Sequence, residues 1–255
     1  MNQDQLLAGL AALATDAPAG LLDRIAARWV RVPGPIGELT VAFTDQGIAY
    51  LRHGDGFAAA FRRRFGRPLV AAERPPAGLL PALRSGRLSG LALDLRGVSD
   101  FQRDVLAAVQ GIPRGEVRPY SWVAARIGRP TAVRAVGAAL ADNPVPLLAP
   151  CHRVTRSDGG LGGYVFGAAA KERLLEEEGV DLDRVRGLAR ERVFYLASDT
   201  TGVVCFPTCH NARRITARHR HGFRTIAQAR AAGYRPCRTC QPAQSGSSAL
   251  TGAAG

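Results

Sequence analysis

The sequence of 255 residues predicts an α+β protein built in three parts, and three observations lead to this fold class. Short apolar segments separated by turns containing Gly and Pro fill residues 29–51, as is typical of β-strands. From residue 97 onward the apolar residues recur with helical spacing. Four of the five cysteines form two close pairs after residue 204. We expect an N-terminal α+β domain at 1–96, a helical helix-turn-helix domain at 97–184, a small zinc-bound α/β module at 190–243 and a disordered tail at 244–255.

The first part carries the predicted strands and two short helices. Pro-Gly-Pro and Asp-Gln-Gly sequences mark the turns between its first three strands. The predicted strands cover residues 29–32, 37–43, 47–51 and 91–95, and the predicted helices cover residues 57–65 and 79–83. A helical lead-in at residues 1–13 and 21–27 precedes them. We find no catalytic constellation in this part.

The helical part begins with a capping-box pattern and continues with a helix-turn-helix pattern. Ser99 and Gln102 have the spacing at which each side chain bonds to the other residue's backbone N–H. Two helices follow, at 121–127 and from Pro130 to about Ala141, with a turn at Gly128. The helix opened by this capping box has an apolar face formed by Phe101, Val105, Leu106 and Val109. The helix from Pro130 has an outer face of small residues, Ala132, Ala135, Ala138 and Ala139. Such small residues suit either close approach to a nucleic-acid groove or ordinary helix packing.

The charge distribution indicates a polyanionic partner. The 34 basic and 21 acidic residues give a formal net charge of +13. Residues 185–255 carry 11 arginines and two acidic residues, so +9 of this excess lies in the last quarter of the chain. A basic excess concentrated in one region is typical of nucleic-acid binding. No apolar run approaches the roughly 20 residues of a membrane span, so we expect no membrane partner and a reducing, cytoplasmic location.

One stretch, residues 143–154, concentrates the candidate chemistry. Cys151 is the only cysteine of the first 204 residues, so it has no disulfide partner there. His152 and Arg153 follow it directly, and nearby positive charge favours the thiolate. Asn143 and Glu178 are candidate orienting partners of a nucleophile and its base. A buried core cysteine is the alternative interpretation, and the pattern favours a reactive one.

This stretch resembles the active-site signature of the O6-alkylguanine-DNA alkyltransferases. The matching residues are Asn143-Pro144-Val145-Pro146, Pro150-Cys151-His152-Arg153-Val154, Phe101-Gln102, Ile112-Pro113-Arg114-Gly115-Glu116-Val117, Tyr120, Arg134-Ala135-Val136-Gly137, Gly163-Tyr164 and Glu177-Glu178-Gly179. The resemblance implies a ribonuclease-H-like N-terminal domain and a winged-helix-like second domain. It also implies an irreversible transfer of an alkyl group from O6-alkylguanine, and from O4-alkylthymine, in double-stranded DNA to Cys151. The implied protein is monomeric, nucleoid-associated and without a cofactor for alkyl transfer.

The resemblance also implies a role for each site residue. Cys151 attacks the alkyl carbon, His152 deprotonates the thiol through a water, Glu178 orients His152, and Asn143 bonds to the backbone near the active-site turn. Arg134 fills the gap left by the flipped base, Tyr120 crowds the flanking phosphate, Tyr164 lines the base pocket, and Arg153, Val154 and Pro146 complete the contacts with the base and the DNA. From the residues alone, Arg134 is a surface arginine and each tyrosine a packing residue.

The remaining cysteines have the spacing of metal ligands. Cys205 and Cys209 form a C-x3-C pair, and Cys237 and Cys240 form a C-x2-C pair, with 27 residues between the two pairs. In an intracellular protein this spacing predicts a structural Zn²⁺ site, with unrelated thiols or two disulfides as the alternatives. Thr225 and Gln228 are expected to cap a helix between the pairs that ends at Gly233.

These cysteines lie in segments similar to the metal-binding domain of the adaptive-response protein Ada. The matching residues are Thr200-Thr201-Gly202-Val203-Val204-Cys205-Phe206-Pro207-Thr208-Cys209 and Ala232-Gly233-Tyr234-Arg235-Pro236-Cys237-Arg238-Thr239-Cys240-Gln241-Pro242. The similarity implies that Cys205 is a candidate second methyl acceptor, for methyl groups on DNA phosphotriesters. Two features depart from the family: Phe206 replaces a frequent Arg, and the module follows the alkyltransferase part.

Two other functions remain as alternatives at this point. The chain could be a non-catalytic DNA-binding regulator whose Cys151 senses alkylation or oxidation. It could also be a cysteine hydrolase that uses Cys151 and His152, although adjacent residues on one turn are poor geometry for a catalytic dyad.

Overall fold

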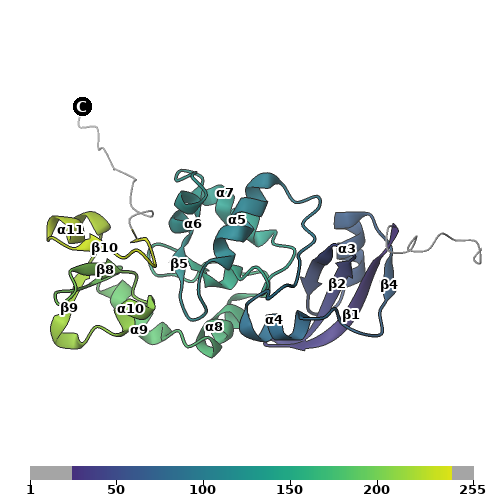
Figure 1. The fold of residues 1–255 in the computed structure, drawn as a ribbon, viewed down its shortest axis with the longest axis horizontal. Helices are drawn as coiled ribbons and strands as arrows, with labels where there is room; N and C mark the ends of the chain where they lie inside the picture. Colours follow the sequence, from purple (N-terminus) through teal and green to yellow (C-terminus); the bar gives the residue numbers. More distant parts are fainter. Residues whose placement is uncertain (1–24, 243–255) are drawn as a thin grey trace, which may run out of the picture.

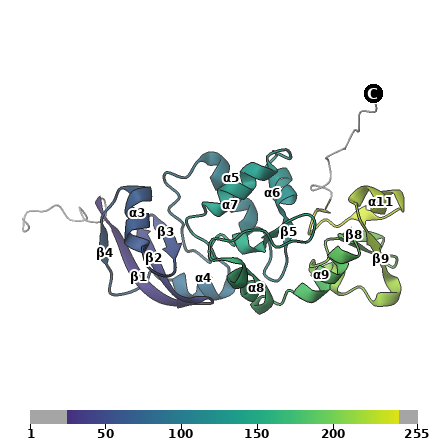
Figure 2. The ribbon, with the colours of Figure 1, turned by 180° about the vertical axis from the view of Figure 1, so that it is seen from behind.

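The computed structural model describes residues 25–242. Three parts lie in a row, with a sheet at the N-terminal end, helices in the middle and a second, smaller sheet at the C-terminal end (Figure 1). The view from behind shows the same order (Figure 2). The helix expected at 1–13, most of that at 21–27 and the expected disordered tail at 244–255 lie outside the described residues. The helix at 21–27 cannot reach its expected end, because a strand begins at Ala27.

The N-terminal sheet has four strands. They are β1 (Ala27–Gly34), β2 (Gly37–Thr44), β3 (Gly47–Arg52) and β4 (Leu69–Ala71), in the order β3-β2-β1-β4. β1 pairs with β2 and β2 with β3 in antiparallel register, whereas β4 runs parallel to β1. The first three strands confirm the sequence prediction. The three-residue edge strand β4 was not predicted.

The predicted strand at 91–95 is wrong. This segment forms a single parallel bridge, between Leu93 and Ile48 at the edge of β3. The carboxylate of Asp94 accepts hydrogen bonds from the side chains of Thr44 (2.7 Å) and Arg96 (2.8 Å). Because a carboxylate engaged with its neighbours competes with ladder formation, the segment leaves the sheet after one residue.

Two helices accompany this sheet, as predicted: α3 (Phe57–Phe65) and α4 (Leu79–Ser85). Phe57 and Phe61 of α3 pack on Tyr50 of β3, with ring centroids 5.4 Å and 6.0 Å apart. α4 lies between the sheet and the helical part (Figures 1 and 2).

The helical part surrounds a short parallel ladder. Its elements are α5 (Asp100–Gln110), β5 (Arg118–Pro119), α6 (Tyr120–Arg126), α7 (Val133–Ala141), the 3-10 turn η1 (Cys151–Arg153), β6 (Val154–Thr155) and α8 (Ala168–Glu177). Ser99 caps α5 by accepting from the backbone N–H of Gln102 (3.2 Å). The reciprocal half of the predicted capping box is missing, because the Gln102 amide donates instead to the Ala139 carbonyl (3.0 Å).

The helix predicted from Pro130 begins at Val133, since residues 130–132 form a turn. Of its predicted outer alanines, Ala135 and Ala138 are exposed and Ala132 is half-buried. The prediction is wrong for Ala139, which is buried with Val136 and Leu140. Residues three and four apart share one helical face, and this face packs against α5.

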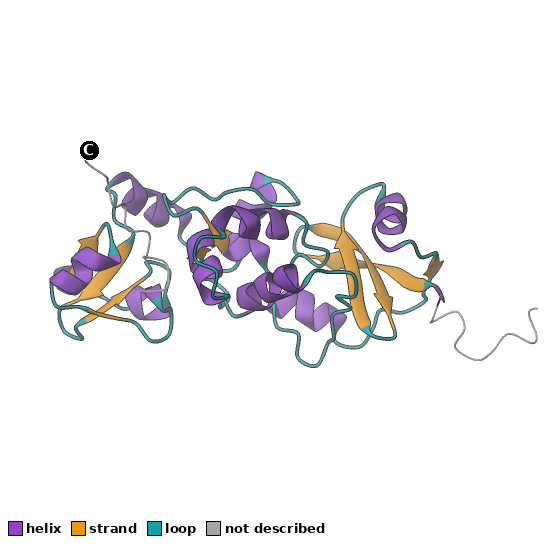
Figure 3. Cartoon of the chain, turned by 90° about the horizontal axis from the view of Figure 1, so that it is seen from above, coloured by secondary structure: helices purple, strands orange, loops and turns teal. Residues whose placement is uncertain are grey.

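The C-terminal part is a second four-stranded sheet with short helices. It consists of β7 (Tyr195–Ser198), β8 (Val203–Cys205), α10 (His210–Arg213), the 3-10 turn η2 (Ala217–His219), β9 (Arg220–Phe223), α11 (Ile226–Ala231) and β10 (Arg235–Pro236), after the linking helix α9 (Leu182–Arg190). The sheet order is β10-β8-β7-β9, and Figure 3 shows helices on both sides of it. Thr225 and Gln228 make both bonds of the predicted capping box, and α11 ends at Ala231, two residues before the expected Gly233.

The hydrophobic core crosses the boundaries between these parts. One cluster of buried apolar side chains extends from Val30 in the first sheet to Cys240 in the last. Contact between buried apolar surfaces excludes water along its whole length. Across the described residues, no helix has the length and apolar character needed to cross a membrane.

Candidate active site and metal centre

Asn143 organises the turn that carries Cys151. Its side chain is fully buried, and its amide nitrogen donates to the Ala149 carbonyl (2.8 Å) and to the Cys151 sulfur (3.2 Å). Its amide oxygen accepts from the backbone N–H of Val145 (2.9 Å). A single side chain therefore fixes both ends of the loop and points a donor at the sulfur, where it stabilises a thiolate.

The N-terminal sheet supports the same loop from outside. The Pro144 carbonyl accepts from the backbone N–H of Leu51 (2.9 Å) and from the Arg52 guanidinium (3.2 Å). Leu147 adopts a left-handed backbone conformation with φ of 73° although it is buried. A non-glycine residue in this conformation is held against its local preference by the surrounding structure. Both hydrogen bonds and buried apolar contacts thus hold the loop before Cys151 in place.

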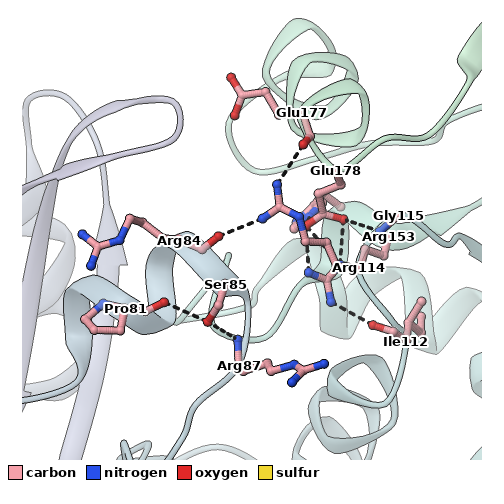
Figure 4. A network of polar contacts seen from close by, with 11 residues as sticks. Pro81, Arg84, Ser85, Arg87, Ile112, Arg114, Gly115, Arg153, Glu177 and Glu178 are labelled. Atoms are coloured by element: carbon pink, nitrogen blue, oxygen red, sulfur yellow. Dashed lines mark hydrogen bonds and ion pairs between the residues drawn. The ribbon is translucent and has the colours of Figure 1, made fainter.

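His152 and Arg153 both contact Glu178, the C-cap residue of α8. Glu178 Oε1 lies 3.1 Å from His152 Nε2, and its two oxygens accept from Arg153 Nε (2.9 Å) and Nη2 (2.7 Å). Burial by itself would raise the pKa of Glu178, but the hydrogen bonds from His152 and Arg153 lower it to about 2. Figure 4 shows Arg153 and Glu178 facing each other, with the Gly115 backbone beside them.

The His152 imidazole is set up to accept a proton. Burial lowers its pKa against the opposing effect of Glu178, so the ring is neutral at pH 7. When Nε2 donates to the Glu178 carboxylate, Nδ1 carries the free lone pair. Nδ1 is buried and has no hydrogen-bond partner among residues 25–242.

Cys151 is a protected thiol in the free protein. It is 5% exposed, and burial raises its pKa, with the Asn143 hydrogen bond and the charges of Lys171 and Arg52 acting in the opposite direction. No contact joins Cys151 and His152 directly among the described hydrogen bonds. The thiol therefore requires a base to become nucleophilic at pH 7.

Lys171 is a functional candidate that sequence reasoning missed. It is fully buried on α8, and its ammonium donates to the carbonyls of Val154 (2.6 Å) and Leu161 (2.5 Å). Burial lowers the pKa of Lys171 to about 8. A signal was present in the sequence, because Lys171 is the single lysine among 34 basic residues. Nothing in the sequence distinguished Arg52 from the other arginines.

The two predicted tyrosines lie on either side of a glycine loop. Tyr120 is half-buried, and its hydroxyl packs against Gly162, which has φ of +72° and where a Cβ would lie 2.9 Å from that oxygen. The Tyr164 ring lies edge-on to His152 at 5.9 Å, and its hydroxyl is buried without a partner in the described part of the chain. Burial raises the pKa of both phenols. Both stay protonated and can donate.

The structure separates the other predicted DNA-contact residues into two groups. Arg134 is exposed on α7. Arg153, Val154 and Pro146 are buried in the free protein, where Arg153 holds Glu178 and the Val154 carbonyl receives Lys171. Their role in contacting base or DNA stays a prediction.

Arg114 connects this site to the N-terminal part (Figure 4). Its guanidinium donates to the Arg84 carbonyl at the end of α4 and to the Glu177 carbonyl at the end of α8, both at 2.8 Å. The two helix ends that it bridges carry partial negative charge, which a cation stabilises. The position of Glu178 is therefore coupled to that of α4.

The four C-terminal cysteines converge on one point. Their sulfurs lie within 4.8 Å of one another, and all four side chains are buried and unpaired by disulfides. Tetrahedral Zn²⁺ with bonds of about 2.3 Å to four thiolates requires such a cluster. The residues Cys205, Cys209, Cys237 and Cys240 thus fit a structural zinc ion, in the part of the chain where the sequence predicted one.

Comparison with known proteins gives matches to both parts. Residues 100–180 match the family model of the 6-O-methylguanine DNA methyltransferase DNA-binding domain, and residues 186–243 match that of the metal-binding domain of Ada. A methylated-DNA–protein-cysteine methyltransferase of Methanosarcina barkeri is 39% identical over 153 residues, which are 58% of this chain and 94% of that one. One of Methanothermobacter thermautotrophicus is 53% identical over 91 residues, 36% of this chain and 51% of that one, so the chain spans about half its length. The solved Mycobacterium tuberculosis OGT in complex with DNA is 33% identical, with a TM-score of 0.50 over 62% of this chain and 98% of that chain.

Proposed function

Since the chain belongs to the methylated-DNA–protein-cysteine methyltransferase family, we propose that it repairs DNA by moving an alkyl group from O6-alkylguanine to Cys151. One observation carries the proposal: a buried cysteine faces an orienting amide, and the neighbouring histidine is buried, neutral and held by a carboxylate. The same site acts on O4-alkylthymine.

The thiol proton leaves through His152. Its Nδ1 accepts this proton through a water, and the Glu178 carboxylate stabilises the imidazolium that forms. The Asn143 amide and the nearby Lys171 charge stabilise the thiolate. The thiolate then attacks the alkyl carbon in line with the leaving guanine oxygen. The sulfur–carbon bond forms as the oxygen–carbon bond breaks, and the guanine takes up one proton.

The target base has to leave the duplex, because its O6 atom lies within the base stack. Arg134, exposed on α7, fills the space that the base vacates, and Tyr120 crowds the flanking phosphate. Tyr164 lines the pocket, and its hydroxyl donates a hydrogen bond that polarises the purine. Arg153, Val154 and Pro146 shape the pocket wall behind the base.

The product is a thioether, so the reaction consumes the protein and uses no cofactor. Return of the alkyl group from the thioether sulfur to the guanine oxygen has no comparable driving force. Each protein molecule therefore repairs one lesion, and the amount of repaired guanine equals the amount of protein consumed.

The C-terminal module contributes structural Zn²⁺ and DNA affinity. Its net positive charge suits the phosphate backbone. Its similarity to the Ada domain makes Cys205 the candidate acceptor for methyl groups of phosphotriesters. Cys205 lines a surface hollow together with Arg214, Arg218 and Arg235, whose charges attract a phosphate. Incubation with methylphosphotriester DNA and mapping of the Cys205 peptide tests this second activity.

The finer description of the fold belongs to the same proposal. The domains extend over 1–96, 97–184 and 190–243. The sheet order β3-β2-β1-β4, with β4 parallel to β1, supports a ribonuclease-H-like first domain, and the pair α6–α7 supports a winged-helix-like second one. The protein acts as a monomer on the nucleoid, where its substrate is. Limited proteolysis tests the domain boundaries. Sedimentation velocity tests whether the protein is a monomer.

Peptide mapping by mass spectrometry, after incubation with duplex DNA carrying O6-methylguanine, tests the main proposal. One methyl group on the Cys151 peptide is expected, and none in Cys151→Ser. DNA binding without any methyl transfer would instead identify a sensor. Repeated turnover of an ester would identify a hydrolase.

A further inference from the structure

We propose that the zinc centre of the C-terminal module supports the alkyl-acceptor site, and that Trp122 is the positioning residue that joins the two. The C-terminal module is residues 195–242. The inference rests on the proposed function in one respect, the identity of Cys151 as the acceptor. It is carried by the contacts of residues 115–122, the connecting segment, with the metal-binding loops and with Glu178.

Trp122 links the helix-turn-helix to a metal-binding loop. It is 5% exposed on α6, and its indole N–H donates to the backbone carbonyl of Cys240 (3.1 Å). A buried indole N–H requires an acceptor, and here a metal ligand's own carbonyl provides it. One turn later, Arg126 donates to the Gln241 side chain (2.8 Å) at the surface. The loop that carries the fourth cysteine therefore rests on α6.

Glu116 makes a second link, to the loop of Cys209. It is 1% exposed, its Oε1 accepts from the backbone N–H of His210 (3.0 Å), and its Oε2 accepts from Arg118. His210 is the first residue of α10 and follows Cys209 directly. Burying a carboxylate is costly unless its oxygens accept hydrogen bonds. The ordered position of the Cys209 loop thus supplies one of the two donors to Glu116.

A third set of contacts places the connecting segment against the first cysteine pair. Thr208 Oγ1 accepts from the backbone N–H of Val117 (3.0 Å). The buried Arg118 guanidinium lies 5.2 Å from the ring centroid of Phe206, the residue that follows Cys205. This explains why Phe stands there, because an apolar ring covers a buried cation that a second arginine would repel.

The same segment contacts the acceptor site with its other side. The Gly115 N–H donates to Glu178 Oε2 (3.3 Å). At Gly115, which has φ of +76°, a Cβ would lie 2.6 Å from the Glu178 carbonyl, so no larger residue fits. Arg118 and Pro119 pair in parallel with Val154 and Thr155, the residues directly after the Cys151 turn. The eight residues of the connecting segment thus contact both the metal loops and the carboxylate that holds His152.

Loss of the metal would break these links. The ligand loops of a module this small are ordered by the zinc, and without it the four thiols have no shared partner. The buried Trp122 would then lose its acceptor and the buried Glu116 one of its donors, and the half-buried Val117 N–H would lose its acceptor as well. The segment between them is the one that pairs with the acceptor turn, so its loosening reaches Cys151.

Hydrogen–deuterium exchange of the full chain, zinc-loaded and after chelation, tests the inference. Peptides covering residues 115–123 and 150–156 are expected to exchange about tenfold faster without zinc, the change that one lost buried hydrogen bond produces. Peptides covering β1–β3 should keep their rates. The rate of methyl transfer to Cys151 should fall with the same zinc dependence.

Trp122→Phe tests the link without removing the metal. This variant keeps a ring and loses the N–H donor, and Trp29→Phe in the N-terminal sheet is its matched control. Zinc content should stay at one ion per chain in both. Only Trp122→Phe should show faster exchange at residues 150–156 and slower methyl transfer.

Three results would overturn the inference. They are faster exchange confined to residues 195–242 on chelation, a uniform rise that includes β1–β3, and a Trp122→Phe protein that exchanges like Trp29→Phe. The proposed function fails separately, if zinc-loaded wild-type protein takes no methyl group on Cys151. The exchange data would still report whether the two sites are connected.

Discussion

Glu178 Oε1 lies 3.1 Å from His152 Nε2, and both groups are almost completely buried. Arg153 occupies the rest of the same carboxylate. His152, which follows Cys151, is thereby held in one orientation, and its Nδ1 has no hydrogen-bond partner among residues 25–242.

Glu178→Gln should slow alkyl transfer by about 10²-fold or more, the usual contribution of a positioned acid–base group. The amide cannot stabilise the imidazolium, and it leaves Arg153 without its anion. Single-turnover kinetics on a lesion oligonucleotide measure the rate. Glu177→Gln, exposed on the same helix turn, is the control and should transfer at the wild-type rate.

The same carboxylate makes stability depend on pH. Its pKa is lowered from 4.5 to about 2 on folding, so its contribution is present above pH 4.5 and is lost as the pH falls toward 2. The shift corresponds to about 3 kcal/mol. Urea unfolding at pH 7 and pH 3 should show this loss in wild-type protein and a smaller one in Glu178→Gln. Equal losses would contradict the assignment.

Asn143→Ala should cost about 1–3 kcal/mol of unfolding free energy, because the Ala149 carbonyl and the Val145 N–H are left buried and unpaired. The Cys151 thiol should also react more slowly with iodoacetamide. Gln46→Ala, exposed in the turn between β2 and β3, provides a comparison that should leave the reactivity of Cys151 unchanged. Wild-type reactivity in Asn143→Ala would remove this amide from the chemistry.

Lys171→Met should slow transfer, because the carbonyls of Val154 and Leu161 lose their donor and Cys151 loses a nearby cation. A second consequence concerns pH. The pKa of Lys171 falls from 10.5 to about 8 on folding, so the unfolded chain binds more protons between these values and stability rises there with pH. Unfolding free energies measured from pH 8 to 10 should show this rise in wild-type protein and not in Lys171→Met.

Gly162→Ala should destabilise the tyrosine loop by about 1–2 kcal/mol, since its φ of +72° disfavours any side chain. The added methyl would also displace Tyr120, whose hydroxyl lies 2.9 Å from that point, and so reduce lesion binding. Gly163→Ala is the matched control, because a Cβ there meets nothing within 4 Å. Thermal unfolding and DNA titration compare the two. Equal stability and equal DNA affinity of Gly162→Ala and Gly163→Ala would contradict the steric argument.

Sequence patterns predicted the elements whose periodicity is strong. Three strands of the first sheet, α3, α4 and α11 follow from alternation, helical spacing and caps. They failed at 91–95, where Asp94 bonds locally, and at Ala139, whose burial depends on where α5 packs. Both failures come from tertiary contacts that strand and helix patterns do not encode: Asp94 bonds to Arg96 nearby and to Thr44 of β2, and α7 packs against α5.

The candidate site divides in the same way. Motif residues such as Cys151, His152 and Glu178 could be singled out from the sequence, and the structure brings them together. Lys171 stands out in the sequence only as its single lysine, and Trp122 does not stand out at all, because the importance of both comes from acceptors on other elements, at Val154 and Cys240. Supporting contacts of this kind are not marked by any fixed spacing in the sequence.

The most direct test of the central claim is the intact mass of the full chain after incubation with excess duplex DNA carrying O6-methylguanine. One methyl group per chain is expected, located on the Cys151 peptide, with an equal amount of guanine restored in the DNA. The Cys151→Ser variant should take up no methyl group. Unmodified Cys151 in a zinc-loaded protein that binds the duplex would contradict it.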